Sequence, residues 1–265
     1  MRQFLDNLII YFSGTGNCLA IARKISGLIG GGIFRITAES VHTPPKFNIG
    51  KCVIVLPSYA YGAPKLVRKF LKTAEIKAEY LAILVSYGSK PGAAGAQVKK
   101  LLAKKRQKTD LYLGIQSVEN YIPIFGLDPK KKEKNLIAQD EQTLSAAAKI
   151  IGGERNKMRT FYPLGSPISL IFRAALPLLN RLFKITDACK NCGLCVRACP
   201  SGALTSGQDK PKYNRKKCEH CQACLNICPA KAVRFWRYNE SSPRYRHLDV
   251  EMTDLFCREE MENGE

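Results

Sequence analysis

Short apolar runs alternate with longer helical patterns over residues 1 to about 155. The apolar runs predict strands at residues 8–12, 33–36, 52–56, 81–85 and 111–117. Apolar residues at helical spacing predict helices near residues 17–28, 63–73, 92–106 and 138–151. The runs are continuously apolar, which is typical of a parallel sheet that helices cover on both faces. The pattern predicts a doubly wound α/β domain with a five-stranded parallel sheet.

The C-terminal half carries a different pattern, because Cys-x-x-Cys-x-x-Cys-x-x-x-Cys-Pro occurs there twice. The two copies contribute Cys189, Cys192, Cys195 and Cys199, and then Cys218, Cys221, Cys224 and Cys228. Three cysteines at this spacing wrap one iron–sulfur cubane, and the fourth, followed by proline, ligates the other cluster. We therefore expect two 4Fe-4S clusters, held by Cys189, Cys192, Cys195 and Cys228 and by Cys218, Cys221, Cys224 and Cys199.

Zinc and disulfides are the alternatives for these cysteines. A zinc site uses two pairs and has no role for a third evenly spaced cysteine or for the proline. Disulfides are expected in small secreted domains, and we find no signal-peptide pattern at the N-terminus. The repeat resembles the bacterial two-cluster ferredoxin over residues 186–236, and Ala203 and Ala232 also occupy equivalent positions in the two copies. The resemblance implies a small α+β ferredoxin-like domain.

A loop rich in hydroxyl groups and glycine joins the first predicted strand to the first predicted helix. It consists of Ser13, Gly14, Thr15, Gly16, Asn17 and Cys18. Backbone N–H groups at a helix N-terminus bind phosphate, and hydroxyl groups add donors. The loop lacks the lysine of a triphosphate-binding loop and the third glycine of the dinucleotide fingerprint. It therefore suits a monophosphate, the alternative being a glycine-rich turn that only starts a helix.

This loop resembles the FMN phosphate loop of flavodoxins, except that Cys18 replaces a threonine and brings a weaker donor. The resemblance implies bound FMN and two further loops beside the isoalloxazine ring. These loops contain Ser58, Tyr59, Ala60, Tyr61 and Gly62 after the third strand, and Tyr87, Gly88 and Ser89 after the fourth. Tyr59 or Tyr61 is expected to stack on the ring, and the alternative for each tyrosine is packing within its own loop.

The domain organisation follows from these patterns. We expect a flavodoxin-like domain at residues 1–155, an amphipathic linker helix at 156–185, a ferredoxin-like domain at 186–236 and a tail at 237–265. The linker face expected to pack between the domains contains Ile168, Ile171, Phe172, Ala175, Leu178, Leu179 and Leu182. Arg173, Asn180, Arg181 and Lys184 are assigned to its opposite face. No charge-free run reaches the roughly 20 residues that span a bilayer, and contact with a membrane surface is the alternative role of this helix.

The chain is strongly basic, with 42 Lys and Arg residues against 22 Asp and Glu and a formal net charge of +20. This excess implies an acidic partner or surface, for which we expect an acidic electron-transfer protein, a ferredoxin or flavodoxin. The isolated Cys18, Cys52 and Cys257 are consistent with the reducing cytoplasm. We expect His220 to be a solvated neighbour of the cluster ligands and Trp236 to be a packing residue.

The whole pattern resembles the flavodoxin–ferredoxin fusion proteins of anaerobic bacteria and archaea, including Asn120-Tyr121-Ile122 and the tail sequence Tyr245-Arg246-His247. The resemblance implies that electrons pass between the clusters and FMN, which links one-electron donors to two-electron chemistry. An enzyme that reduces an unidentified substrate and a carrier between protein partners both fit. A nucleic-acid-binding protein with structural clusters is a third hypothesis, which lacks a recognition helix or an aromatic RNA platform.

Overall fold

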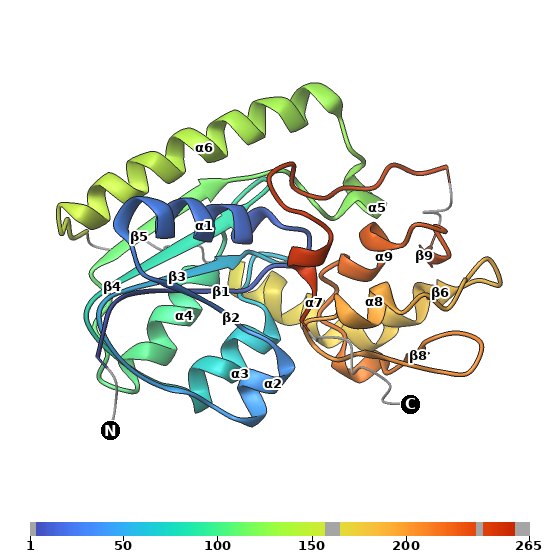
Figure 1. Ribbon diagram of the computed structural model, residues 1–265, viewed down its shortest axis with the longest axis horizontal. Helices are drawn as coiled ribbons and strands as arrows, with labels where there is room; N and C mark the ends of the chain where they lie inside the picture. Colours follow the sequence, from blue (N-terminus) through green and yellow to red (C-terminus); the bar gives the residue numbers. More distant parts are fainter. Residues whose placement is uncertain (1–3, 157–164, 237–240, 258–265) are drawn as a thin grey trace, which may run out of the picture.

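A computed structural model describes residues 4–156, 165–236 and 241–257. The larger part of the molecule is a parallel five-stranded sheet in the order β2-β1-β3-β4-β5 (Figure 1). The strands are β1 (Phe4–Tyr11), β2 (Gly32–Arg35), β3 (Lys46–Pro57), β4 (Glu75–Tyr87) and β5 (Leu111–Gln116). This is the flavodoxin-like doubly wound order. The predicted fold class is confirmed.

Helices cover both faces of this sheet (Figure 1). One face carries α1 (Asn17–Ile29) and α6 (Pro129–Ile151), and the other carries α2 (Ala38–His42), α3 (Lys65–Thr73) and α4 (Ala94–Ala103). Neighbouring strand residues therefore face two separate cores. In β1, Ile9 packs against α1 and α6, whereas Ile10 packs on the α3 side, and both are fully buried. Burial on both faces explains the continuous apolar runs.

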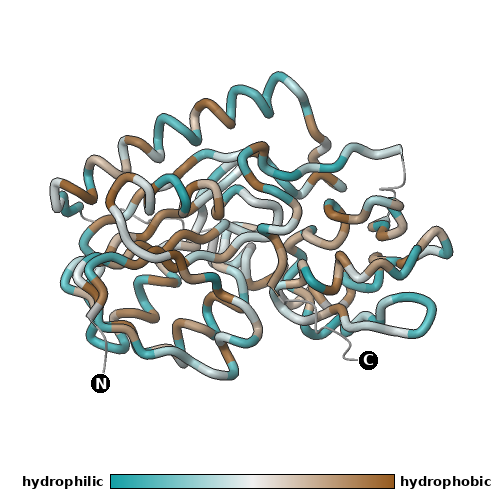
Figure 2. Tube along the Cα trace, in the orientation of Figure 1, coloured by the Kyte–Doolittle hydropathy of each residue, from teal (hydrophilic) through white to brown (hydrophobic). Residues whose placement is uncertain are grey.

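Three elements, α6, β3 and β4, begin earlier than the apolar pattern predicted. Helix α6 begins at Pro129, because Asp128 caps it by accepting hydrogen bonds from the backbone N–H groups of Lys130 and Lys131. Its first turns are rich in lysine and lack the apolar spacing that marks a helix. Figure 2 shows α6 alternating between hydrophobic and hydrophilic residues. Strands β3 and β4 also begin early, with Lys46 paired to Glu75 before the apolar run starts.

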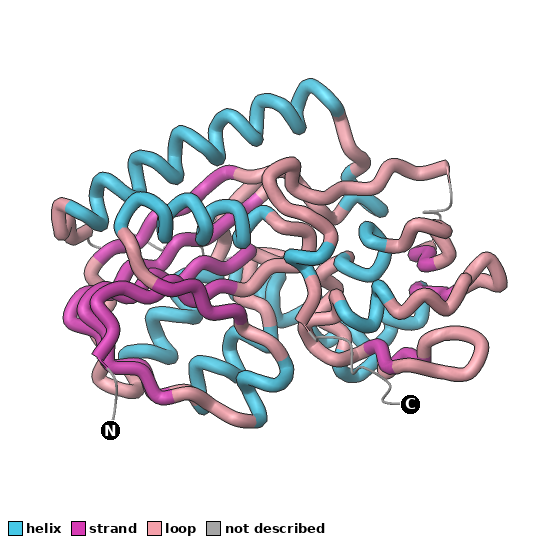
Figure 3. Tube along the Cα trace, viewed as in Figure 1, coloured by secondary structure: helices cyan, strands magenta, loops and turns pink. Residues whose placement is uncertain are grey.

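The second part of the molecule is small and consists mostly of loops (Figure 3). Its strands form two antiparallel pairs, β6 (Phe183–Ile185) with β9 (Val233–Phe235) and β7 (Leu204–Thr205) with β8 (Lys212–Tyr213). Its helical turns are α8 (Leu194–Arg197), η2 (Arg215–Lys217) and α9 (Ala223–Ile227). A unit this small buries little apolar surface, so bound metal is the expected source of much of its stability.

The linker contains α7 (Gly165–Leu179) and η1 (Asn180–Leu182), but its orientation differs from the prediction. Ile171 and Leu178, which were expected to pack, are 68% and 64% exposed. Asn180, which was expected to face solvent, is buried and donates a 2.8 Å hydrogen bond to the Arg215 carbonyl. The predicted packing of Trp236 is also wrong, because this residue is 60% exposed. Apolar residues lie all around α7, so their spacing alone does not identify its buried face.

The remaining elements are short. Helix α5 (Ile122–Phe125) follows β5, and η3 (Thr253–Leu255) lies in the C-terminal segment. Among the described helices, none has the length and apolar content needed to cross a membrane.

Candidate flavin and iron–sulfur sites

The loop after β1 leaves the N-terminus of α1 available to a ligand. Gly16 occupies the N-cap position with φ = 105° and provides no side-chain cap. The Ser13 hydroxyl accepts a 3.1 Å hydrogen bond from the Gly16 N–H, which curls the loop around the helix end. The first N–H groups of a helix have no partners within that helix. An anion at this end would satisfy them, and the helix dipole would favour its negative charge.

A narrow cleft runs beside this loop. It is lined by Ser13, Gly14, Thr15, Asn17, Cys18, Ser58, Tyr59, Tyr87, Gly88, Glu119 and Asn120, among others. The Thr15 hydroxyl accepts a 3.0 Å hydrogen bond from the Asn120 amide, which orients it at the cleft. Burial raises the pKa of the Cys18 thiol to about 12, so this side chain is a neutral, weak donor.

A wider pocket of about 280 Å³ adjoins the cleft, and we call it the ring pocket. It is lined by Ser58, Tyr59, Ala60, Tyr61, Gly88, Ser89, Lys90, Glu119, Asn120, Tyr121, Ile124, Phe125, Phe172 and His220. Ser58, Tyr59, Gly88, Glu119 and Asn120 line both spaces. The buried Ser58 hydroxyl has no hydrogen-bond partner among the described residues, so a polar ligand atom would satisfy it. The cleft and the ring pocket together suit a phosphate group attached to a flat aromatic ring.

The two tyrosines expected beside the ring differ in position. Tyr59 lines both the cleft and the ring pocket, and burial raises the pKa of its hydroxyl well above the usual value. Tyr61 lines only the ring pocket and adopts φ = 62° in a turn. Gly62 follows this turn without lining either space. A Cβ at Gly62 would lie 2.1 Å from the Ser169 hydroxyl of α7, so this glycine allows the linker helix to pack closely.

His220 joins the ring pocket to the cysteine-rich part of the molecule. It is 3% exposed, so the expectation of a solvated residue is wrong. Its Nδ1 atom lies 3.0 Å from the Tyr121 hydroxyl, and the rings of Phe183 and Phe235 pack around it at 5.1 Å between centroids. Burial lowers the pKa of His220 to about 4. The imidazole is therefore neutral at pH 7.

The structure brings the eight repeat cysteines together in two groups. The electrostatic neighbours of Cys195 include Cys228, Cys189 and Cys192, and those of Cys221 include Cys199 and Cys218. Cys224 lies near Cys218, Cys221 and Cys199. Each fourth cysteine thus lies beside the first three of the other copy. Within the described ranges, no three His, Cys, Asp or Glu side chains are placed to hold a single metal ion, as a zinc site would require.

Backbone N–H groups donate hydrogen bonds to the sulfur atoms at equivalent positions of the repeat. Ala203 donates to Cys199 at 3.2 Å, and Ala232 donates to Cys228 at 3.3 Å. These are the two alanines that the repeat pattern aligns. Hydrogen bonds of this kind stabilise thiolates and tune the reduction potential of a cluster.

The group formed by Cys199, Cys218, Cys221 and Cys224 is the one beside the flavin site. A Cβ at Gly14 would lie 2.5 Å from the Cys221 carbonyl oxygen, so only glycine allows the phosphate loop this approach. His220, between Cys218 and Cys221 in the chain, forms part of the ring pocket wall. In the other group, the Cys192 side chain is exposed. The structure thus places one cysteine group beside the ring pocket, whereas the other group includes the exposed Cys192.

The C-terminal segment covers the phosphate loop from outside (red in Figure 1). Tyr245 is buried and donates a hydrogen bond to the Asn17 side chain, and the His247 N–H donates to the Thr15 carbonyl at 3.0 Å. A Cβ at Gly16 would lie 2.9 Å from the His247 Cβ. The sequence pointed to Tyr245 and His247 only through a family resemblance, because a short tail has no periodicity that reveals burial.

The same segment connects the two parts of the molecule. Asp254 pairs with the two terminal guanidinium nitrogens, Nη1 and Nη2, of Arg23 on α1, at 2.6 and 2.5 Å. Three residues further on, the Cys257 N–H donates to the Arg197 carbonyl at 2.8 Å. The Arg197 guanidinium stacks over the Phe256 ring at 4.3 Å. The tail therefore fastens the cysteine-rich part to α1.

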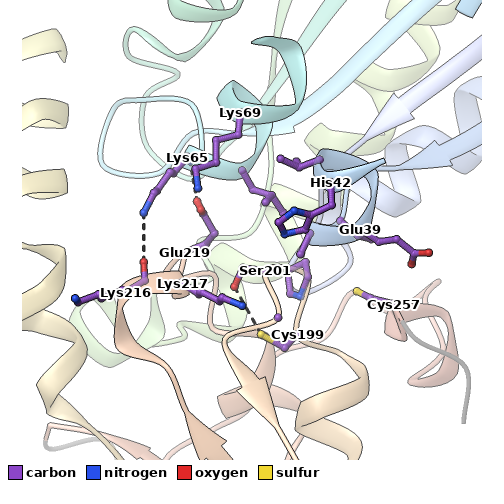
Figure 4. Close-up of a pocket in the computed structure, with 16 residues that line it drawn as sticks. Glu39, His42, Lys65, Lys69, Cys199, Ser201, Lys216, Lys217, Glu219 and Cys257 are labelled. Atoms are coloured by element: carbon purple, nitrogen blue, oxygen red, sulfur yellow. Dashed lines mark hydrogen bonds between the residues drawn. The ribbon is translucent and has the colours of Figure 1, made fainter. Parts of the chain in front are cut away.

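A basic groove of about 400 Å³ lies between α2, α3 and the cysteine-rich part (Figure 4). Its walls carry Lys65, Lys69, Lys216 and Lys217, and Cys199 lies in its lining. Its two glutamates are Glu39 and Glu219, and Glu219 accepts a 2.7 Å hydrogen bond from the Lys65 N–H at the start of α3. Four lysines therefore face two carboxylates, one of which is already bound to a helix N-terminus.

The cysteine-rich part of the chain matches a known sequence family, and the other matches are distant structural neighbours. The sequence model of the 4Fe-4S dicluster domain matches residues 188–232. No curated protein matches the chain. A Bacteroides eggerthii protein assigned as a flavoprotein is 16% identical, with 42% of this chain and 88% of that chain covered at a TM-score of 0.35. Megasphaera elsdenii flavodoxin is 17% identical, with 51% and 98% covered at a TM-score of 0.34.

A WrbA-like flavodoxin from Agrobacterium tumefaciens is 13% identical, with 55% of this chain and 98% of that chain covered at a TM-score of 0.33. The flavodoxin-like fold itself is shown by the strand order and the parallel pairing. An iron–sulfur domain beside such a fold supports electron transfer that involves flavin and iron–sulfur chemistry. The chain joins a flavodoxin-like α/β domain to a 4Fe-4S dicluster domain, which is the architecture of a flavodoxin–ferredoxin fusion protein.

Proposed function

We propose that this protein transfers electrons between two 4Fe-4S clusters and a bound FMN. The observation that carries the proposal is the contact of Gly14 with Cys221, which brings the phosphate loop against a cluster ligand. We assign the near cluster to Cys199, Cys218, Cys221 and Cys224, and the outer cluster to Cys189, Cys192, Cys195 and Cys228. The exposed Cys192 makes the outer cluster accessible to a donor, and the near cluster then lies between it and the flavin.

The residues of the loop and of the ring pocket would hold FMN. Ser13, Thr15 and the first N–H groups of α1 would bind the phosphate, and the ring would lie between Tyr59, Tyr61 and the 87–89 loop. Bound FMN exchanges electrons singly or in pairs, whereas each cluster carries one. His220 and Tyr121 line the pocket on the side of the near cluster, where their packed rings would exclude water.

Anaerobic reconstitution tests this assignment. We expect about eight iron atoms per chain, which follows from two cubanes, and FMN on chromatography of the released flavin. FAD, or four iron atoms per chain, would contradict it. A screen of electron acceptors for flavin reoxidation would then separate an enzyme with its own substrate from a carrier between proteins.

We also propose that the partner is an acidic electron-transfer protein and that it docks at the basic groove. Lys216 and Lys217 stand beside Cys199, a ligand of the near cluster in our assignment, so carboxylates bound there would bring the partner's redox centre close. The strength of such steering falls with salt, since the Debye length shrinks from about 10 Å at 0.1 M to about 3 Å at 1 M.

Stopped-flow association with an acidic ferredoxin tests the groove. We expect the rate to fall steeply with ionic strength and the double variant Lys216→Glu, Lys217→Glu to flatten that dependence. Lys99→Glu, Lys100→Glu is the matched control, because it changes the charge equally at exposed positions of α4. Equal effects of the two variants would show that net charge, and not this groove, governs association.

A further inference from the structure

Helix α7 presents an apolar face to solvent, and its partly polar side is packed inward. Among the α7 residues whose burial the structure describes, the exposed ones are Pro167, Leu170, Ile171, Ala174 and Leu178. They follow one another at i, i+3, i+4, i+7 and i+11, so they form one continuous stripe on the helix. Leu170, Ile171 and Leu178 are 62%, 68% and 64% exposed, whereas Ser169 is buried. Large apolar surfaces that stay exposed mark interaction sites.

The apolar stripe continues beyond the end of α7. Leu182 in η1 is 38% exposed, and its carbonyl accepts a 3.1 Å hydrogen bond from the Trp236 N–H. Trp236, the single tryptophan of the chain, is 60% exposed. Tryptophan side chains favour the boundary between lipid and water, because the ring is apolar and the indole N–H is polar. We call the stripe, Leu182 and Trp236 together the α7 surface.

Basic residues border the α7 surface, and acidic residues are lacking in this part of the sequence. Residues 155–186 contain six Lys and Arg and no Asp or Glu. Arg181 and Lys184 are exposed at the end of the helix. The surface therefore combines an apolar stripe with positive charge at its border.

We propose that the α7 surface binds the face of an anionic phospholipid bilayer. The fifteen residues of α7 extend about 22 Å, less than the roughly 30 Å hydrocarbon core, so the helix would lie in the interface plane. An apolar face bordered by Lys and Arg is the pattern of such interfacial helices. A second copy of the chain is a poorer occupant, because the basic borders of two copies would face each other.

This binding would place the flavin site at the membrane surface. Phe172, on the inner side of α7, lines the ring pocket. Ile124 and Phe125 line the same pocket from α5 and are 56% and 69% exposed. Helix α7 is thus both a wall of the ring pocket and the proposed contact with lipid.

Sedimentation of the reconstituted protein with vesicles tests the proposal. A protein with a net charge of +20 is attracted to any anionic vesicle, so binding is compared at low salt and at 1 M salt, where charge attraction is screened. We expect binding to phosphatidylglycerol–phosphatidylcholine vesicles to persist in part at 1 M salt, with a blue shift of Trp236 fluorescence. Pure phosphatidylcholine vesicles should bind at least tenfold more weakly at low salt.

Variants of exposed apolar residues distinguish the α7 surface from general charge attraction. Ile171→Glu, Leu178→Glu should weaken vesicle binding at least tenfold. Ile137→Glu, Ile151→Glu on α6 is the matched control, since both residues are 55% exposed and lie elsewhere, and it should change binding less than twofold. Equal losses in the two variants, or no binding at 1 M salt, would overturn the proposal. A dimer in sedimentation equilibrium that only the α7 variant disrupts would assign the surface to a second copy instead.

Discussion

Tyr245 donates a 2.5 Å hydrogen bond to the side chain of Asn17, a residue 228 positions earlier in the chain. Both residues are buried, and the Asn17 amide in turn donates to the Val118 carbonyl at 2.9 Å. The C-terminal tail therefore reaches the helix end that would bind the flavin phosphate. It also connects this site to the loop after β5.

Replacing Tyr245 with phenylalanine should destabilise the protein. The variant leaves the Asn17 carbonyl oxygen buried without its donor, which costs on the order of 1–3 kcal/mol. We expect the free energy of unfolding in denaturant to fall by that amount, with flavin affinity falling as well because Asn17 begins α1. If the midpoint of unfolding in denaturant is unchanged in this variant, the hydrogen bond from the tail does not stabilise α1.

Alanine substitutions at two glycines of the α1 region should have opposite effects. Gly16→Ala places a Cβ 2.9 Å from His247 at φ = 105°, so we expect a loss of more than about 1 kcal/mol and faster proteolysis of the tail. Gly27→Ala is the control, since nothing lies within 4 Å of its Cβ position. It should stabilise the protein by about 0.4–1 kcal/mol. Similar effects at both positions would argue against close packing of the tail.

Acid should loosen the tail through His247. Burial lowers the pKa of this residue, although Asp249 and Asp140 partly oppose the shift. The unfolded chain therefore binds a proton at higher pH than the folded protein does. This contribution to stability is complete above about pH 6.5 and decreases as the pH falls below that value.

Unfolding between pH 5 and 7.5 measures this effect. The Nδ1 atom of His247 accepts a hydrogen bond from the Asp249 N–H, and Nε2 lies 2.8 Å from the Gln139 amide. A neutral glutamine at position 247 cannot titrate, so His247→Gln should reduce the pH dependence over this range. If the stability of this variant depends on pH as steeply as that of the parent protein, groups other than His247 cause the pH dependence.

In the assignment proposed above, each fourth cysteine ligates the cluster of the other repeat copy, so substitutions of these two cysteines test the assignment. Cys199→Ala should damage the cluster held by Cys218, Cys221 and Cys224, and Cys228→Ala should damage the other one. EPR spectra that resolve the two reduced clusters measure which signal is lost in each variant. Loss of the cluster formed within the same repeat copy would reverse the assignment.

Thr15→Ala should weaken flavin binding. The Thr15 hydroxyl lines the phosphate cleft and accepts a hydrogen bond from Asn120, so its removal takes one polar group from the proposed phosphate site and leaves the amide unpaired. We expect a loss of about 1–3 kcal/mol in FMN affinity, measured by fluorescence titration. Thr43→Ala, at an exposed position in another loop, is the control.

Local patterns in the sequence determined the sheet, the phosphate loop and the cysteine repeat. Continuous apolar runs such as residues 52–56 mark strands that are buried on both faces, and the repeat spacing reflects the chemistry of its ligands. These features depend on neighbours in the chain, so the sequence alone reveals them. The alignment of Ala203 with Ala232 also emerged there, although the hydrogen bonds to sulfur that explain it did not.

Tertiary structure decided the features that depend on distant contacts. The burial of His220, the coverage of Gly16 by His247 and the outward face of α7 all arise where segments far apart in the chain meet. A tail without periodicity gives no signal of burial, and a helix that is apolar all around does not show which side is covered. Packing between the two parts of the molecule decides which of these residues are buried. The area that two surfaces bury against each other depends on the assembled structure and not on either segment alone.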